Sequence, residues 1–168
     1  MKHHQQTVGK NDEWLTPPEI IAALGAFDLD PCAPVNRPWS TARRHYTERS
    51  NGLARKWRGR VWCNPPFNRY LRQQWMQRMA EHGNGVMLVP AATETEAFDR
   101  WIWKCADAVC FVKTRPHFHF VNGVRAPFNC GTAIALAAYG MENVASLEAA
   151  NLGTTLRMNR GIDGKDSP

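Results

Sequence analysis

The stretch Val61-Trp62-Cys63-Asn64-Pro65-Pro66-Phe67 decides the fold that the sequence predicts. Residues 60–63 suit a strand, and the two prolines must end it, because proline has no N–H to donate to a neighbouring strand. A residue before proline favours extended geometry, so Asn64 and Pro65 should form a stiff elbow. Residues 69–82 then carry apolar side chains at close to helical spacing. This order puts Asn64 at the carboxyl end of a strand, where open α/β sheets bind their ligands.

Two hydrogen-bond acceptors at this elbow suit chemistry at an amino nitrogen. The exocyclic N6 amine of adenine is a weak nucleophile, because its lone pair is delocalised into the ring. The side-chain oxygen of Asn64 and the backbone carbonyl of Pro65 can accept from its two N–H groups and localise that lone pair. Phe67 would stack on the base, a contact worth roughly 1–3 kcal/mol. The alternative is an ordinary Asn-Pro turn between a strand and a helix.

Length and charge predict one domain with an anionic partner. The chain has 168 residues, of which 43% are hydrophobic, and its net charge is +6. This length suits a single core. The charge favours nucleic acid, although a solvated basic surface is the simpler explanation. The residues expected to contact nucleic acid are Arg43, Arg44, Arg55, Lys56, Arg69 and Arg115.

Several classes of protein are disfavoured. No apolar run is long enough to cross a bilayer, and the start lacks an apolar signal core, so we expect a cytoplasmic protein without a membrane partner. The five cysteines include no Cys-x-x-Cys pair, and their odd number argues against a disulfide framework. His117 and His119 have no cysteine or carboxylate cluster beside them, so we expect a solvated strand face and no metal site.

The segment before the elbow contains two further motifs. After a polar arm at residues 1–12, Thr16 is expected to cap a helix that begins at Pro17 and ends before Gly25. An ordinary capped helix would explain Trp14-x-Thr-Pro equally well. Residues 27–33 then read Phe-Asp-Leu-Asp-Pro-Cys-Ala, a strand that proline ends. Asp30 should therefore lie at a strand tip and meet a cationic or hydroxylated ligand, unless it only forms a solvated turn.

The interval 34–59 is expected to be an irregular basic loop. Its arginines and aromatic side chains fit contact with a nucleic-acid backbone and unstacked bases. The alternative is that its aromatic residues anchor the loop to the core, and we expect this of Trp57.

The remaining chain alternates apolar strands with helices. Strands are predicted at 85–90, 108–112 and 132–139, and helices at 96–105, capped by Thr93 or Thr95, and at 143–150, with a hairpin turn at Asn122-Gly123. The fold class expected is therefore α/β: a single doubly wound domain at 13–150, with a mostly parallel sheet and a late antiparallel strand. A flexible tail is expected at 151–168.

Taken together, the motifs resemble those of phage-type DNA N6-adenine methyltransferases, the Dam-like enzymes. Trp14-x-Thr16-Pro17, residues 27–33 and residues 63–67 occur in the family's order, and the resemblance runs from Glu13 to Tyr139. It implies a Rossmann-like methyltransferase fold, S-adenosylmethionine (SAM) as cofactor, double-stranded DNA as substrate and a phage or prophage gene in a bacterial cell. It implies that Asn64, Pro65, Pro66 and Phe67 hold the target adenine. The cofactor-binding residues it implies are Trp14, Thr16, Pro17, Asp28, Asp30, Pro31, Cys32 and Ala33.

The chain departs from the usual methyltransferase pattern at two points. Residues 31–33 contain no glycine where a glycine-rich loop is usual, and Glu48 is the nearest candidate for the acid that binds the cofactor ribose. No separate recognition domain fits this length, so loops 34–59 and 114–129 should supply specificity. The alternatives are methylation of RNA adenine or of a protein glutamine, and a nucleic-acid-binding module without catalysis.

Overall fold

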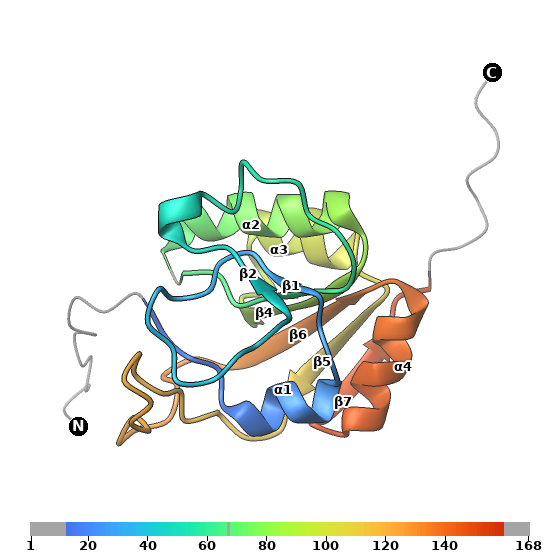
Figure 1. The fold of residues 1–168 in the computed structure, drawn as a ribbon. Helices are drawn as coiled ribbons and strands as arrows, with labels where there is room; N and C mark the ends of the chain where they lie inside the picture. Colours follow the sequence, from blue (N-terminus) through green and yellow to red (C-terminus); the bar gives the residue numbers. More distant parts are fainter. Residues whose placement is uncertain (1–12, 67, 160–168) are drawn as a thin grey trace.

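The computed structural model describes residues 13–66 and 68–159, which form one α/β unit (Figure 1). Within them a seven-stranded sheet has the order β2-β1-β3-β4-β6-β5-β7. The strands are β1 (Leu29–Asp30), β2 (Arg44–His45), β3 (Val61–Cys63), β4 (Gly85–Pro90), β5 (Ala108–Val112), β6 (Ile134–Tyr139) and β7 (Gly153–Arg157). The helices are α1 (Pro18–Leu24), α2 (Arg69–His82), α3 (Glu96–Phe98) and α4 (Met141–Ala150), with a π-helical turn at Asp99–Trp103 and a 3₁₀ turn at Glu48–Ser50.

The sheet is mixed, and the expectation of a mostly parallel sheet was wrong. The pairs β2–β1, β1–β3 and β3–β4 are parallel, whereas β4–β6, β6–β5 and β5–β7 are antiparallel. The reason is that β6 inserts between β4 and β5, so one reversed strand makes two antiparallel pairs, and β7 adds a third. The four parallel strands still end at a common edge, which brings the tips of β1 and β3 together.

Helices cover both faces of the sheet, as a doubly wound fold requires. In Figure 1, α2 and α3 lie above the sheet and α1 and α4 below it. Alternate residues of each strand supply two separate cores: Cys63 and Met87 face α2, whereas Trp62 and Val86 face α1 and α4. Cys63 is fully buried and belongs to the core on the α2 face.

The long apolar elements were predicted well, and the short ones were not. The bounds expected for α2, β4 and β5 are confirmed, and Thr95 caps α3 by accepting from the Phe98 N–H at 3.3 Å. The interval 34–59 was expected to be irregular but contains β2 and the 3₁₀ turn. Trp57 anchors it as predicted: the ring is buried, and its Nε1–H donates to the Gly52 carbonyl at 2.9 Å.

The ends of the chain need one correction. Residues 153–157 were expected to belong to a frayed tail, but they pair with β5 as the edge strand β7. The β-branched side chains of Thr154 and Thr155 favour a strand here despite the polar composition. The arm expected at residues 1–12 lies outside the described residues, as do residues 160–168, and the domain limits stay a prediction. Across the described ranges, no helix combines the length and apolarity that crossing a membrane requires.

Arg60 ties the amino edge of the sheet to the helices below it. Its guanidinium donates to Asn143 Oδ1 at 2.6 Å, to Ser146 Oγ at 2.9 Å and to the carbonyls of Leu24 and Ala26, each at 2.9 Å. It also lies over the Phe27 ring, 4.2 Å from the centroid. This arginine, which directly precedes β3, therefore has a structural role.

Replacing Arg60 with methionine is expected to lower the free energy of unfolding by at least about 2 kcal/mol, because it leaves buried acceptors without a charged donor. Denaturant unfolding followed by circular dichroism measures the change. Arg58→Met is the matched control, since Arg58 is exposed and two residues away. Equal loss in both variants would contradict a structural role for Arg60.

Candidate active site

The elbow after β3 presents one free acceptor atom. The Asn64 side chain donates through Nδ2 to the Trp14 carbonyl at 3.0 Å and to Thr16 Oγ1 at 3.1 Å. Because a carbonyl oxygen can only accept, the first bond fixes which end of the amide is the NH₂ group. The other end, Asn64 Oδ1, is buried and has no hydrogen-bond partner among the described residues. A buried acceptor without a donor is costly, so this oxygen is suited to an N–H group from a ligand.

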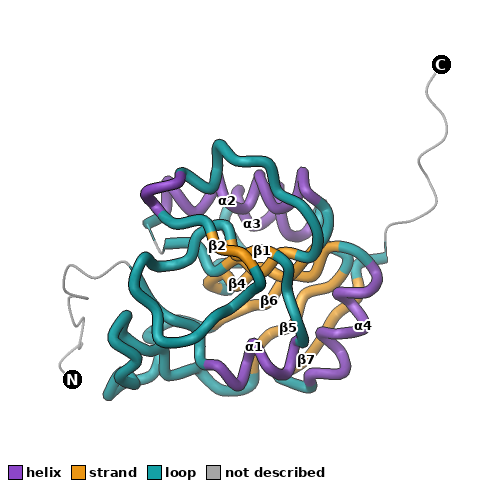
Figure 2. Tube along the Cα trace, viewed as in Figure 1, coloured by secondary structure: helices purple, strands orange, loops and turns teal. Residues whose placement is uncertain are grey.

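A cavity of about 390 Å³ opens beside Asn64 and reaches Asp30. It lies where the carboxyl ends of β1 and β3 meet, the edge at which loops gather in Figure 2. Most of the predicted cofactor and base residues line it: Trp14, Thr16, Asp30, Pro31, Cys32, Ala33, Asn64, Pro65 and Pro66. Phe67, expected to stack on the base, lies outside the described residues.

Two of the expected cofactor-binding residues, Pro17 and Asp28, do not line the cavity, and Thr16 lines it without capping α1 as expected. Thr16 was expected to cap α1, but the N-cap residue is Pro17 and no side chain caps this helix, because the Thr16 hydroxyl binds Asn64 instead. Pro17 is not among the residues that line the cavity. Asp28 lies at the opposite, amino end of β1, where its carboxylate accepts from the Arg60 N–H at 2.8 Å.

Asp30 is the buried charge of the site. Its side chain accepts from the Thr41 hydroxyl at 2.5 Å and from the Cys32 N–H at 3.1 Å. Burial raises the pKa of this carboxyl to about 6, while the two hydrogen bonds and the charge of Arg37 act in the opposite direction. A carboxyl that is costly to ionise in the free protein gains from a cationic ligand. Thr41 was not predicted as a site residue, because nothing near it in the sequence indicates contact with Asp30.

The cavity is acidic although the protein is basic. Glu13, Asp30 and Glu48 line it, and within residues 13–66 and 68–159 no lysine or arginine does. The pKa of Glu13 is raised, first by partial burial and then by the charge of Glu48. Glu48 begins the 3₁₀ turn three residues after β2, so the acid that the sequence offered as nearest candidate for the ribose does reach this cavity. The charges therefore favour a ligand with a net positive charge.

A glycine from another segment lies against residues 31–33, where methyltransferases usually have a glycine-rich loop. Gly52 lies against the backbone of Pro31, where a Cβ atom would approach the Pro31 carbonyl oxygen to 1.8 Å. Only glycine permits this contact without a backbone shift. Gly52 also lines the cavity, and the turn sequence Ser50-Asn51-Gly52 was its one signal in the chain.

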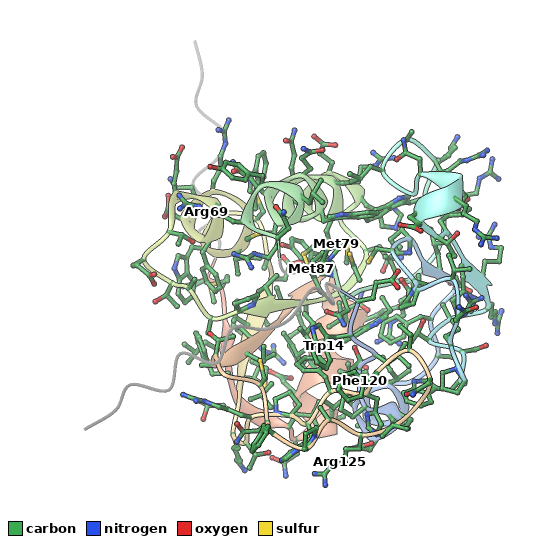
Figure 3. All side chains as sticks on the ribbon, turned by 90° about the vertical axis from the view of Figure 1, so that its left-hand side faces the viewer. Trp14, Arg69, Met79, Met87, Phe120 and Arg125 are labelled. Carbon is green, nitrogen blue, oxygen red and sulfur yellow. The ribbon has the colours of Figure 1, made fainter. Side chains whose placement is uncertain are left out.

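The two loops expected to give specificity pack on each other beside the cavity. Trp39 contacts the His119 ring edge-on, with centroids 5.2 Å apart, and His119 pairs through its backbone with Leu15. The expected hairpin here is reduced to isolated bridges. Figure 3 shows Phe120 close to Trp14, and their ring centroids are 5.2 Å apart. Loop 114–129 thus supports the segment whose carbonyl orients Asn64.

The six cations expected to contact nucleic acid are all exposed, but they do not form one patch. Arg43 lies at the amino edge of the sheet, 3.7 Å from the Asp28 carboxylate. Arg55 donates to the Ser50 carbonyl and Arg115 to the Gly131 carbonyl. None of the six, which also include Arg44 and Lys56, lines the acidic cavity, whereas Arg69 lines a second one.

The mixed sheet and the cavity at its carboxyl edge are compatible with a methyltransferase-like fold. A family model described as DNA N-6-adenine-methyltransferase (Dam) matches residues 3–138. The chain therefore belongs to the Dam family of DNA adenine methyltransferases. No curated protein and no solved structure matches the chain.

Proposed function

We propose that the protein transfers a methyl group from SAM to the N6 amine of an adenine in double-stranded DNA. The observation that carries this proposal is the buried, unpartnered Oδ1 of Asn64, a residue that lines an acidic cavity, in a chain of the Dam family. The target base would be extruded from the duplex, which costs a few kcal/mol, and enter the cavity beside the elbow.

Asn64 would act as a fixed acceptor for the amine. Its NH₂ group is committed to Trp14 and Thr16, so the amide has one fixed orientation, with Oδ1 unpaired, before any base arrives. Pro65 lines the cavity next to it, and its carbonyl is the second expected acceptor. Two acceptors draw the amine towards tetrahedral geometry and localise its lone pair. Because they are positioned in advance, little reorganisation is needed during the reaction.

The acidic residues fit SAM. Bound there, SAM would supply an electrophilic methyl group on a positively charged sulfur. Asp30 and Glu13 would stabilise positive charge in the cavity, and Glu48 would accept from ribose hydroxyls. Thr16 would contact the methionine part while holding Asn64 in place. These proposed roles are supported by the acidic lining of the cavity, which favours a cationic ligand such as SAM.

Direct transfer requires no covalent intermediate on the protein. Cys63 immediately precedes the elbow, but its side chain is fully buried on the α2 face. Cys32 lies 3.5 Å from it, sulfur to sulfur, and burial raises the pKa of the Cys32 thiol well above its usual range. A thiol that resists ionisation is a poor nucleophile, so neither cysteine is assigned a catalytic role.

The test offers SAM labelled in its methyl group together with duplex DNA, RNA of the same sequence or a mixture of proteins. We expect label in DNA, recovered as N6-methyladenine after digestion to nucleosides, and nucleases sensitive to adenine methylation then locate the site. Label in RNA or in glutamine would replace the DNA proposal with one of the alternatives. Failure to bind labelled SAM would indicate a nucleic-acid-binding module.

A further inference from the structure

A second cavity, of about 230 Å³, lies between the first turns of α2 and the start of α3. Its floor is the carboxyl end of β4, at Val89 and Pro90, so it opens on the same edge of the sheet as the acidic cavity. Arg69 and Arg72 line it from α2, and Glu96 is the one acid on its wall. Neither the family match nor the proposed chemistry assigns this cavity a role.

The charge of this cavity is opposite to that of the first. Arg69 and Arg72 are three positions apart, so they lie on one face of the helix. The pKa of Arg72 is lowered, first by burial and then by the charge of Arg69. Both arginines line the same cavity, and guanidinium groups bind phosphate oxygens in pairs of hydrogen bonds.

α2 forms a wall between the two cavities. Leu71 and Trp75 line the acidic cavity, whereas Arg69, Arg72 and Met76 line the basic one. The separation is therefore on the order of one helix diameter, about 10 Å, which roughly one or two nucleotides of a strand can span. Figure 3 shows Arg69 at the edge that faces the viewer, apart from Trp14 and Phe120.

We infer that the cavity between Arg69 and Arg72 binds one backbone phosphodiester of the DNA strand that carries the target adenine. This inference rests on the proposed function for the identity of the strand. The phosphate would fix the register of the strand, so that a base one or two nucleotides away reaches the Asn64 elbow. Phosphate contacts of this kind position a protein on DNA without reading sequence.

The test measures the affinity for a random-sequence duplex of about 20 base pairs as a function of salt, for the wild type, Arg69→Gln, Arg72→Gln and the double variant. Each phosphate neutralised contributes about 0.9 to the slope of log K against log salt. The double variant should lose about 0.9, because both arginines serve one phosphate. A loss of about twice that would mean two separate contacts, and an unchanged slope would mean none. Either result overturns the inference.

Three controls isolate the effect. Arg58→Gln removes an exposed charge before β3, at the opposite edge of the sheet, and should leave the slope within its error. Labelled SAM binding should stay within about twofold in every variant, and thermal unfolding shows whether the Arg72 variant is folded. Arg69→Gln alters an exposed side chain, so this single variant provides the test if the Arg72 variant does not fold. The inference would also be overturned if inorganic phosphate raised the unfolding temperature of the wild type but not of the double variant, while the substitutions left DNA binding unchanged. The cavity would then bind a free anion.

A duplex with one neutral methylphosphonate linkage completes the test. Moved along the strand, the neutral linkage should weaken wild-type binding most at one position near the methylated adenine, and the double variant should lose this dependence. The salt slope needs no methylation, so an inactive protein with the expected slope change would refute the proposed function but not the phosphate site. Normal methylation by the wild type, together with an unchanged salt slope in the double variant, would refute the phosphate site but not the proposed function.

Discussion

Replacing Asn64 with alanine is expected to abolish methyl transfer while leaving SAM affinity within a few-fold of the wild type. The variant removes Oδ1, the buried oxygen that has no partner in the free protein. Removing one positioned hydrogen-bonding group from an active site lowers the rate by about 10²–10³-fold, and the amine would be left with a single acceptor at the elbow. Single-turnover methylation and equilibrium binding of labelled SAM measure the two quantities separately.

Asn64→Asp is the informative companion to this variant. It keeps an acceptor oxygen but loses the NH₂ group that donates to Trp14 and Thr16. We expect more residual activity than in the alanine variant, because the acceptor is present but less well oriented. Parallel loss of SAM binding and methyl transfer in both variants would mean that the elbow has only a structural role.

The second large effect is expected from Asp30→Asn. With its pKa raised to about 6 by burial, the Asp30 carboxyl is neutral at low pH and charged at neutral pH. Affinity for the cationic cofactor should therefore increase as the pH rises through about 6. Asp30→Asn should bind SAM at least about tenfold more weakly at pH 7.5, because loss of one charged hydrogen-bond partner costs about 1.5–3 kcal/mol. The variant should show no step near pH 6.

Protein stability in the absence of ligand should change with pH in the opposite direction. Because the pKa of Asp30 is raised from 3.8 to about 6, the folded state binds the proton more tightly than the unfolded state. Its stabilising effect is present below pH 4 and is lost as the pH rises through 6, a difference of about 3 kcal/mol. Denaturant unfolding at several pH values measures it, and Asp30→Asn should remove this component.

His45 is the control for both pH profiles, since it is the β2 residue that lies opposite Asp30 in the sheet. Burial and then the charge of Arg37 lower its pKa, and its Nε2 lies 3.3 Å from the Thr41 N–H as an acceptor. The binding step near pH 6 should persist in His45→Gln. If it disappears there and remains in Asp30→Asn, the histidine is the titrating group and the assignment to Asp30 is wrong.

The sequence predicted those parts of the fold that local patterns determine. The apolar run of β4 and the helical spacing of α2 are visible without tertiary contacts, and proline positions gave the tips of β1 and β3. Edge strands β2 and β7 were missed, because two to five polar residues form a strand only when a neighbour offers its hydrogen bonds. The expected late antiparallel strand is present, but the insertion of β6 between β4 and β5 was not predicted, because an apolar run does not indicate which strands will be its neighbours.

The residues of the candidate site were likewise predictable where local sequence patterns place them, and not where distant segments meet. Asn64 and Asp30 could be placed, because each ends a strand at a proline. Contacts between distant segments could not be predicted: Thr16 binds Asn64 across 48 positions, and Gly52 meets Pro31 only after the loop folds back. The charge cluster before the elbow was also too coarse a guide, since Arg60 joins helices to the sheet and Arg43 lies at the amino edge.

The three acids and absence of bases around the larger cavity have a consequence for turnover. Donating the methyl group turns a sulfonium into an uncharged thioether, so the spent molecule has one positive charge fewer than the fresh one. Under the proposed function, the cavity would lose part of its electrostatic attraction for its occupant when the reaction is complete. Exchange of spent for fresh donor would thereby be favoured, while cations outside this cavity would still attract the DNA.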